Sequence, residues 1–264
     1  MRRSLLATLL LLTCAGASAG CYQELTRALP DGGVILFGEY HGTAEAPRFF
    51  GDCVREFSAR GQRPAVFLEM MASESVRLDD YLAGRLDEKA LLQGAQWRIE
   101  DGRSSQAMLD LLRLLREETA AKRVPKVIAF DQADGGPPAT RESAMAANFL
   151  AAWPGTGYTL VLTGNMHARL QPGAPWDAAF TPFAMRIRAK ADKLVSLDVR
   201  YLAGSAWSCT PQCGPDSMSD HVGGVNRSDT PAVKLGVDDP AYSGTFFVGK
   251  VNASAPAARD PIVR

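Results

Sequence analysis

Four short apolar runs constrain the fold of this chain more than any other feature. Each is four residues long, rich in aliphatic side chains and free of polar alternation; they cover residues 34–37, 65–68, 127–130 and 159–162. Such runs are typical of strands that are buried on both faces of a sheet. We expect two later strands, at 195–201 and at 245–251.

Helical patterns separate the apolar runs. Met108, Leu111, Leu112 and Leu115 repeat at helical spacing after a Ser-Ser pair that can cap a helix. Thr140 can cap a second helix over residues 141–152. Strands that alternate with helices predict an α/β fold with a mostly parallel sheet and flanking helices.

Polar side chains follow each apolar run. In chain order they are Glu39 and His41, then Glu69, then Asp131, then Asn165 and His167. The carboxyl ends of parallel strands meet at one edge of a sheet, where such folds place their ligands. A lone Asp or Asn at this point is often a turn former, and a lone His is often a core residue. Because two of the three histidines occupy the same G-x-x-H arrangement, we expect one shared site.

Histidines and carboxylates support two kinds of chemistry. His41, His167 and Glu69 could ligate a divalent metal. Without a metal, an imidazole and a glutamate could activate water, so Glu39, His41, Glu69 and His167 are the catalytic candidates. Beyond residue 20 the sequence contains no G-x-S-x-G elbow, and it contains no P-loop or G-x-G-x-x-G motif. Serine catalysis and nucleotide binding are therefore disfavoured.

Basic side chains add candidates for substrate binding. Arg103 lies in a polar loop that leads into the helix at Met108, and its forked donors would suit an anionic group. Arg141 begins the helix over 141–152, where the helix dipole is unfavourable for a cation. We therefore expect some other interaction to explain an arginine at this position. Together with Asn165 and Asp131, these arginines form the expected substrate-binding set.

Charge and the N-terminus bound the class of protein. Lys and Arg number 29, as do Asp and Glu, and this balance disfavours a nucleic-acid partner. Residues 1–19 have the basic, apolar and small-residue regions of a signal peptide. We therefore expect an exported protein, periplasmic or secreted.

Residues 20–252 are expected to form a single domain with an irregular insertion at 204–242. Residues 253–264 are expected to form a disordered tail.

Four cysteines remain after removal of the leader, and an even number in an exported chain favours disulfides. The most economical of the three pairings joins Cys21 to Cys53 and Cys209 to Cys213. Two alternatives stay open. Cys21 could instead carry a lipid anchor to the outer membrane, or Cys209, Cys213 and His221 could bind a metal. His221 is otherwise interpreted as a solvated loop residue.

Three motifs resemble a known superfamily. Gly38-Glu39-Tyr40-His41, Leu68-Glu69-Met70 and Gly164-Asn165-Met166-His167-Ala168 are similar to motifs of the superfamily of erythromycin esterases, ChaN-type haem-binding proteins and the Tiki and TraB proteins. The segment from Arg141 to Ala146 resembles its R-[DE]-x-x-M-A segment. The resemblance spans roughly residues 30 to 200, and within the superfamily the motifs look most like those of ChaN-type proteins.

The resemblance implies two main functions. One is a hydrolase that attacks an ester, lactone or amide of a small molecule or peptide with activated water. The other is a periplasmic protein that binds haem or a metal without turnover, with Tyr40, Tyr81 and Tyr201 as candidates for a haem-ligating tyrosine. A third, blander interpretation is a catalytically silent lipoprotein that uses the cysteine-stapled loop as an interaction site.

Overall fold

The computed structural model describes residues 20–132, 137, 140–209, 212–224, 229–236 and 239–258. The expected signal peptide lies outside these residues. Within them, no helix has the length and apolar character needed to cross a membrane.

A seven-stranded sheet forms the centre of the fold, in the order β3-β2-β4-β1-β5-β9-β8. All neighbouring strands run parallel except β8, which pairs antiparallel to β9. The strands are β1 (Gly32–Glu39), β2 (Ala65–Met71), β3 (Lys126–Asp131), β4 (Gly157–Gly164), β5 (Leu194–Leu202), β8 (Ala232–Leu235) and β9 (Gly244–Lys250). The predicted α/β class with a mostly parallel sheet is confirmed, and the four apolar runs lie inside β1 to β4.

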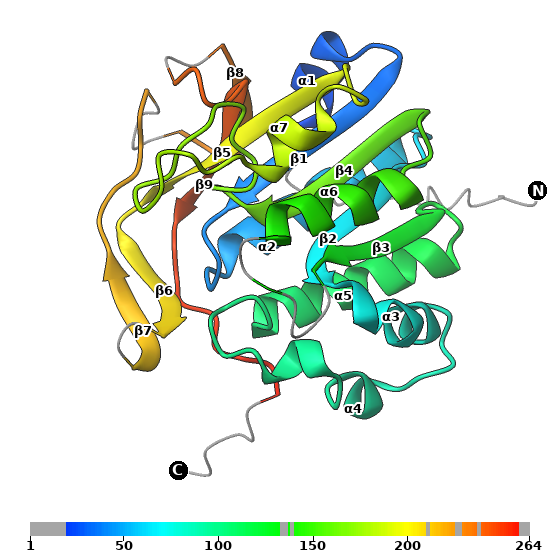
Figure 1. The fold of residues 1–264 in the computed structure, drawn as a ribbon. Helices are drawn as coiled ribbons and strands as arrows, with labels where there is room; N and C mark the ends of the chain where they lie inside the picture. Colours follow the sequence, from blue (N-terminus) through cyan, green and yellow to red (C-terminus); the bar gives the residue numbers. More distant parts are fainter. Residues whose placement is uncertain are drawn as a thin grey trace, which may run out of the picture.

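Helices cover both faces of this sheet (Figure 1). They are α1 (Tyr22–Ala28), α2 (Glu45–Ala59), α3 (Ser75–Leu82), α4 (Glu88–Leu91), α5 (Gln106–Ala120), α6 (Arg141–Ala152) and α7 (Phe183–Ile187), with short 3-10 turns at Ala72–Glu74 and Ala95–Arg98. Side chains of β1 alternate between the two layers. Ile35 and Phe37 pack with residues of α2 and α5, whereas Val34 and Leu36 pack with residues of α6 and α7. Burial on both faces explains why these strands lack polar alternation.

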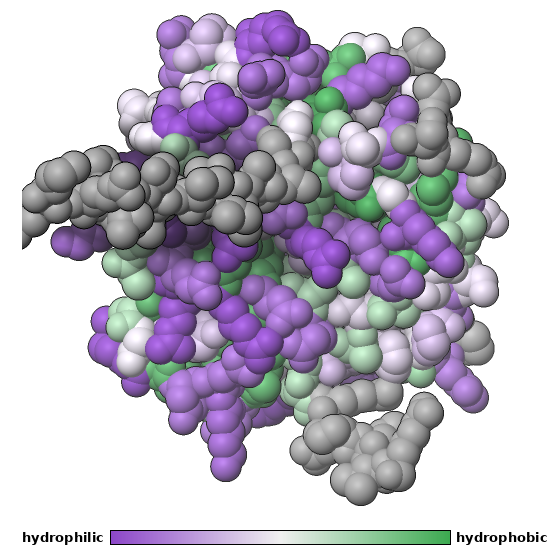
Figure 2. All heavy atoms as spheres, turned by 180° about the vertical axis from the view of Figure 1, so that it is seen from behind, coloured by the Kyte–Doolittle hydropathy of each residue, from purple (hydrophilic) through white to green (hydrophobic). Residues whose placement is uncertain are grey.

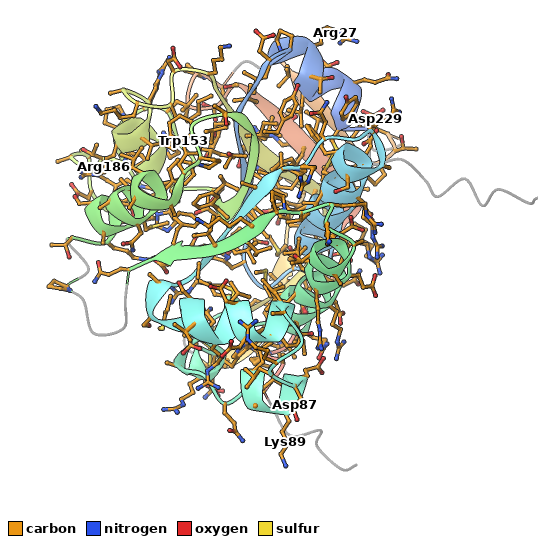
Figure 3. All side chains as sticks on the ribbon, turned by 90° about the vertical axis from the view of Figure 1, so that its right-hand side faces the viewer. Arg27, Asp87, Lys89, Trp153, Arg186 and Asp229 are labelled. Carbon is orange, nitrogen blue, oxygen red and sulfur yellow. A yellow bond between two sulfur atoms is a disulfide. The ribbon has the colours of Figure 1, made fainter. Side chains whose placement is uncertain are left out.

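Charged side chains mark the periphery of the layers. Arg27 of α1 lies at one end of the molecule, and Asp87 and Lys89, at the start of α4, lie at the other (Figure 3). Seen from behind, the surface is largely hydrophilic or mixed, with smaller hydrophobic areas between the charged side chains (Figure 2). Charged side chains are therefore common on the surface. Burial at the strand ends, rather than charge alone, distinguishes the candidate site residues.

The segment expected to be an irregular insertion contains regular structure. β6 (Gly204–Cys209) and β7 (Cys213–Met218) form an antiparallel hairpin in which Cys209 pairs with Cys213, and β8 follows. The hairpin packs closely against the turn after β1, because a Cβ added at Gly42 would lie 2.1 Å from the carbonyl oxygen of Trp207. Glycine permits this approach, and it adopts a positive φ of 80° there.

The two disulfides have the predicted pairing. Cys21 is bonded to Cys53, with Cα atoms 5.9 Å apart, and Cys209 is bonded to Cys213, with Cα atoms 3.8 Å apart. Such bonds are typical of oxidising compartments. The alternative metal site at Cys209, Cys213 and His221 is wrong, because both sulfurs are used in a disulfide. The Cys21 sulfur is likewise bonded to Cys53 and is not available for a lipid.

Part of the expected disordered tail is ordered. Ala253 forms a bridge with Thr43, and Pro256 forms a bridge with Ser105. Ser254 is buried and its Oγ accepts from the backbone N–H of Ala107 at 2.9 Å. These contacts hold residues 253–258 against the starts of α2 and α5, so the expectation is wrong for them. Residues 259–264 lie outside the described part of the chain.

Candidate functional site

The carboxyl ends of β1, β2, β3 and β4 bring the expected side chains to one edge of the sheet. Glu39 is the last residue of β1, Asp131 is the last residue of β3, and Glu69 lies two residues before the end of β2. Asn165 and His167 follow directly on β4. The pairing of β1 with β4 sets Glu39 opposite Gly164, which places the two G-x-x-H turns side by side.

His41 lies between two carboxylates. Its Nδ1 is 3.0 Å from Oε1 of Glu39, and its Nε2 is 3.3 Å from Oε1 of Glu69. A neutral imidazole has one N–H and would turn a lone pair toward one of these acceptors, whereas an imidazolium donates to both. Burial opposes protonation of His41, but Glu69 and Glu39 outweigh it and raise its pKa to about 10.

Glu69 connects the two histidines. Its Oε1 is 3.3 Å from Nε2 of His41 and 3.6 Å from Nε2 of His167. Its Oε2 accepts from the Thr163 hydroxyl at 2.7 Å and from the Gly164 N–H at 2.6 Å. Burial alone would raise the pKa of Glu69, but His167, His41 and Arg141 outweigh it and hold this pKa well below its usual range. Glu69 is therefore a fixed anion at the centre of the site.

Gly164 makes the approach of the two histidines possible. A Cβ at this position would lie 2.9 Å from Nε2 of His41 and 3.3 Å from Cδ2 of His167. The glycine of the second motif therefore leaves room for both rings.

Arginines neutralise the carboxylates behind the histidines. Arg141 donates to Oδ1 of Asp131 at 2.9 Å and to its Oδ2 at 2.7 Å, and its Nη2 is also 2.5 Å from Oε1 of Glu69. Arg103 reaches Asp101 at 2.8 Å and Asp131 at 3.4 Å. The contacts of Arg141 with the buried acids Glu69 and Asp131 therefore explain why it lies at the start of a helix.

Two contacts were not expected from the sequence. Glu142 lies 2.6 Å from Nδ1 of His167 through Oε1, and its Oε2 accepts from the Phe183 N–H at 2.7 Å. The sequence signal that could have indicated Glu142 is its place beside Arg141, at the [DE] position of the R-[DE]-x-x-M-A segment. The second contact joins Nδ2 of Asn165 to Oδ1 of Asp198, 3.4 Å apart, in the middle of β5.

Asp198 anchors a further polar cluster. Its Oδ2 is 3.1 Å from Nε2 of His221 and also contacts Arg200. The backbone of His221 forms a bridge with Tyr201. The interpretation of His221 as a purely solvated residue is therefore wrong, because its ring contacts a buried carboxylate although the side chain is 45% exposed.

A cleft of about 530 Å³ opens over the histidines. Its polar lining includes Glu39, His41, Arg103, Arg141, Asn165 and His167, and its apolar lining includes Tyr40, Met166, Trp176, Phe180 and Trp207. Glu69 and Asp131 lie behind this lining, so the structure places Asp131 against the two arginines rather than in the cleft. Tyr40 lines the cleft, whereas Tyr81 is buried in the core and packs beneath Arg116. Tyr81 is therefore no candidate for a haem ligand.

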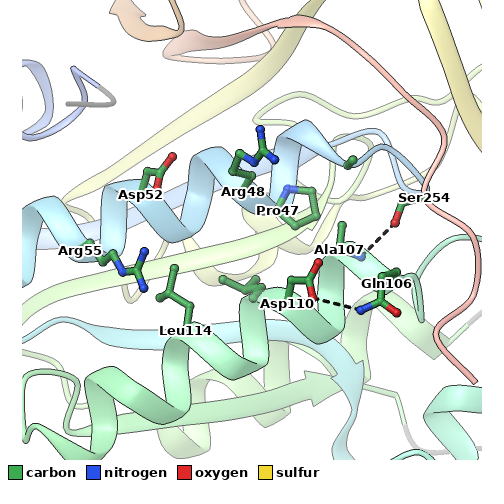
Figure 4. A pocket seen from close by; sticks show the side chains of 11 residues that line it. Pro47, Arg48, Asp52, Arg55, Gln106, Ala107, Asp110, Leu114 and Ser254 are labelled. Atoms are coloured by element: carbon green, nitrogen blue, oxygen red, sulfur yellow. Dashed lines mark hydrogen bonds between the residues drawn. The ribbon is translucent and has the colours of Figure 1, made fainter. Parts of the chain in front are cut away.

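A second hollow of about 460 Å³ lies between α2 and α5, away from these residues (Figure 4). Its lining includes Arg48, Asp52 and Arg55 of α2. Gln106 donates to Asp110 at 3.0 Å across one end of it. None of the side chains expected in a site lines this hollow, so the cleft over the histidines is the better candidate.

The fold and the cleft define a class: an α/β protein that gathers histidines and carboxylates at the carboxyl ends of its parallel strands. The family model described as "Haem-binding uptake, Tiki superfamily, ChaN" matches residues 25–131. This segment holds Glu39, His41 and Glu69, and the match confirms the superfamily resemblance. No curated protein sequence matches the chain.

Solved structures share the fold. A Bacillus cereus protein is 13% identical, with 89% of this chain and 92% of that chain covered and a TM-score of 0.66. A succinoglycan biosynthesis protein is 10% identical, with coverages of 88% and 91% and a TM-score of 0.67. A mutant of the erythromycin esterase EreC in its open conformation is 10% identical, with coverages of 92% and 95% and a TM-score of 0.62. At these identities the likeness concerns the fold alone.

Proposed function

We propose that this protein is an exported hydrolase that cleaves an ester, lactone or amide in the cleft over His41. The observation that carries the proposal is the position of His41, held at both ring nitrogens by carboxylates and still 24% exposed. A proton held in this way is available to a leaving group at neutral pH. This role replaces the expectation that His41 acts as the general base of the resting site.

Glu39 supplies the complementary function. Its Oε1 contacts Nδ1 of His41, while its Oε2 is buried and has no hydrogen-bond partner among the described residues. A buried carboxylate oxygen without a partner is costly, which supports a role with water or substrate. In the proposed reaction, water attacks the carbonyl carbon and loses a proton to Glu39. Nε2 of the His41 imidazolium gives its proton to the leaving oxygen or nitrogen, and the proton held by Glu39 returns to Nε2 through solvent as the product leaves, which restores the resting charges.

The other candidates hold this pair in place. Glu69, which Arg141 contacts, lies on the far side of the His41 ring, and Glu142 lies beside Nδ1 of His167. His167 would then contact the substrate carbonyl, and Asn165, held by Asp198, would present its remaining polar atoms to the substrate. Arg103 and Arg141 both line the cleft but are already paired with acids.

A metal ion at His41, His167 and Glu69 fits this arrangement poorly. Oε1 of Glu69 already accepts from Arg141, so the shared oxygen faces a guanidinium. Among the described residues, one group of at least three His, Cys, Asp or Glu side chains has all its ligand atoms within 4.8 Å of one another, and it comprises Glu100, Cys209 and Cys213. Two of these are joined in a disulfide. No step of the proposed reaction therefore passes through a metal.

The test is hydrolysis by the purified mature protein in the presence of EDTA. Aryl esters, a lactone and an aryl amide are the substrates, and His41→Asn is compared with His221→Asn, the matched histidine outside the cleft lining. We expect turnover that resists EDTA and falls at least about a hundredfold in His41→Asn, because general acid–base catalysis contributes that much. Turnover that needs an added divalent cation, or that survives in His41→Asn, contradicts the proposal.

Haem binding is the second candidate, and the family match over residues 25–131 favours it. The aromatic lining of the cleft, with Tyr40 at 44% exposure, supports a flat ligand. The test is a haem titration that follows the Soret band in the wild type and in Tyr40→Phe. Saturable binding that weakens in Tyr40→Phe, together with no hydrolysis, supports this second candidate over the first.

A further inference from the structure

The lining of the cleft includes exposed apolar side chains. Trp176 is 68% exposed and lies edge-on to Phe180, with ring centroids 5.8 Å apart. Tyr40, at 44% exposure, and Met166 also line the cleft. Large exposed apolar side chains gathered at a concave surface mark a place where a ligand is covered. Their aromatic faces fit a flat, apolar group.

The polar lining of the cleft, taken together with Glu69 and Asp131 directly behind it, carries an excess of negative charge. Two guanidinium groups and two imidazoles stand against the five carboxylates of Glu39, Glu69, Asp101, Asp131 and Glu142. The cluster remains negative even when both imidazoles hold a proton. Both arginines donate to these acids, which offset the positive charge of the two guanidinium groups. A ligand with its own negative charge would add to an existing excess.

Both features combine into one substrate class, which rests on the proposed hydrolase function. We propose that the cleft takes uncharged or, preferably, positively charged esters or amides of an aromatic group, and that it disfavours anionic ones. The ring lies on the wall formed by Trp176, Phe180 and Tyr40. A cation benefits from the carboxylate excess and from the aromatic faces, which attract cations.

The test measures binding without turnover. The probes are three acetophenones whose para substituents differ mainly in charge: trimethylammonio, tert-butyl and sulfonate. A methyl ketone presents the carbonyl group but cannot be hydrolysed. Calorimetric titration of the full mature protein should give the tightest binding for the ammonium compound, and the sulfonate should bind at least about tenfold more weakly.

Variants separate the two parts of the proposal. Trp176→Ala should weaken binding of the ammonium and tert-butyl compounds about three- to tenfold, because it removes an aromatic contact. Val76→Ala is the matched control, since Val76 is 74% exposed but does not line the cleft. Glu39→Gln should reduce the preference for the ammonium compound over the sulfonate, whereas Glu24→Gln, on α1, should not.

Failure of this proposal differs from failure of the hydrolase function. Equal binding of the three ketones, absence of binding, or equal effects of Trp176→Ala and Val76→Ala overturns the substrate class. The matching phenyl acetates then report turnover. The charge order without hydrolysis of any acetate overturns the hydrolase function and leaves a binding site, whereas hydrolysis without a charge order overturns the substrate class alone.

Discussion

Nε2 of His41 lies 3.3 Å from Oε1 of Glu69, so the turn after β1 meets a side chain of β2 at the edge of the sheet. Glu69 is 94 and 95 residues away from its other partners, Thr163 and Gly164. The parallel arrangement of β1, β2 and β4 therefore joins three distant motifs at one carboxylate. The charge of the site and part of the stability of the fold both depend on the contacts of the Glu69 carboxylate.

The stability of the protein should depend on pH through His41. Its folded-state pKa is about 10, above the ordinary value of 6.5. A raised pKa stabilises the fold fully below about pH 6.5, and this contribution is lost as pH rises through about 10. A tenfold change in proton affinity corresponds to about 1.4 kcal/mol, so the loss is expected to reach a few kcal/mol.

Urea unfolding at pH 6 and at pH 10 measures this effect. The fall in the free energy of unfolding should be smaller in His41→Gln than in the wild type, because the variant cannot titrate. Equal pH dependence in both proteins contradicts protonation of His41 between its two carboxylates.

Gly164→Ala should disturb the site more than the fold. The added Cβ would meet Nε2 of His41 at 2.9 Å and must push the ring away from Glu69. We expect a lower pKa for His41, a large loss of hydrolysis, and a change in the free energy of unfolding of about 1 kcal/mol. Gly214→Ala is the control, because a Cβ there meets no atom within 4 Å. Similar losses of activity in both variants would rule out this steric account.

Arg141→Gln should destabilise the fold strongly. It leaves Glu69 and Asp131, both buried, without their shared guanidinium. Breaking a buried ion pair costs about 3–5 kcal/mol. Arg113→Gln removes an exposed pair with Glu88 and should cost at most about 1 kcal/mol. Urea unfolding compares the two variants, and equal costs would show that Arg141 is not the required counter-ion.

The Cys21–Cys53 disulfide should exclude a lipid anchor at Cys21. One sulfur cannot hold both bonds, and the bond closes a loop with a sequence separation of 32. We expect Cys53→Ser to lower the free energy of unfolding by about 3–4 kcal/mol. Mass spectrometry of the purified protein should find the Cys21–Cys53 peptide under non-reducing conditions. A diacylglyceryl group on Cys21 would contradict the prediction.

Sequence patterns predicted the sheet well where burial is complete. The runs at 34–37, 65–68, 127–130 and 159–162 lie in β1 to β4, and the helix over 141–152 matches α6. The hairpin of β6 and β7 was missed, because its strands are rich in Gly, Pro and Ser and its side chains are partly exposed. Such strands show neither a continuous apolar run nor strict alternation.

The residues at the strand ends were also predictable, but their roles were less so. Parallel topology brings Glu39, Glu69, Asp131 and Asn165 to one edge without knowledge of the strand order. Which acid meets which histidine depends on side-chain geometry, so the contact of Glu142 with His167 was not foreseen. The contact of Asn165 with Asp198 depends on β5 lying beside β1, which the sequence does not specify.

The protonation state of His41 tests the account most directly. The chain has three histidines, so ring ¹⁵N resonances can be assigned by comparison with His41→Asn and His221→Asn. The EDTA-treated protein at pH 8 should show both ring nitrogens of His41 protonated, as expected for an imidazolium between Glu39 and Glu69. A neutral His41 ring at pH 8, or one that changes only when a divalent metal is added, would contradict the account.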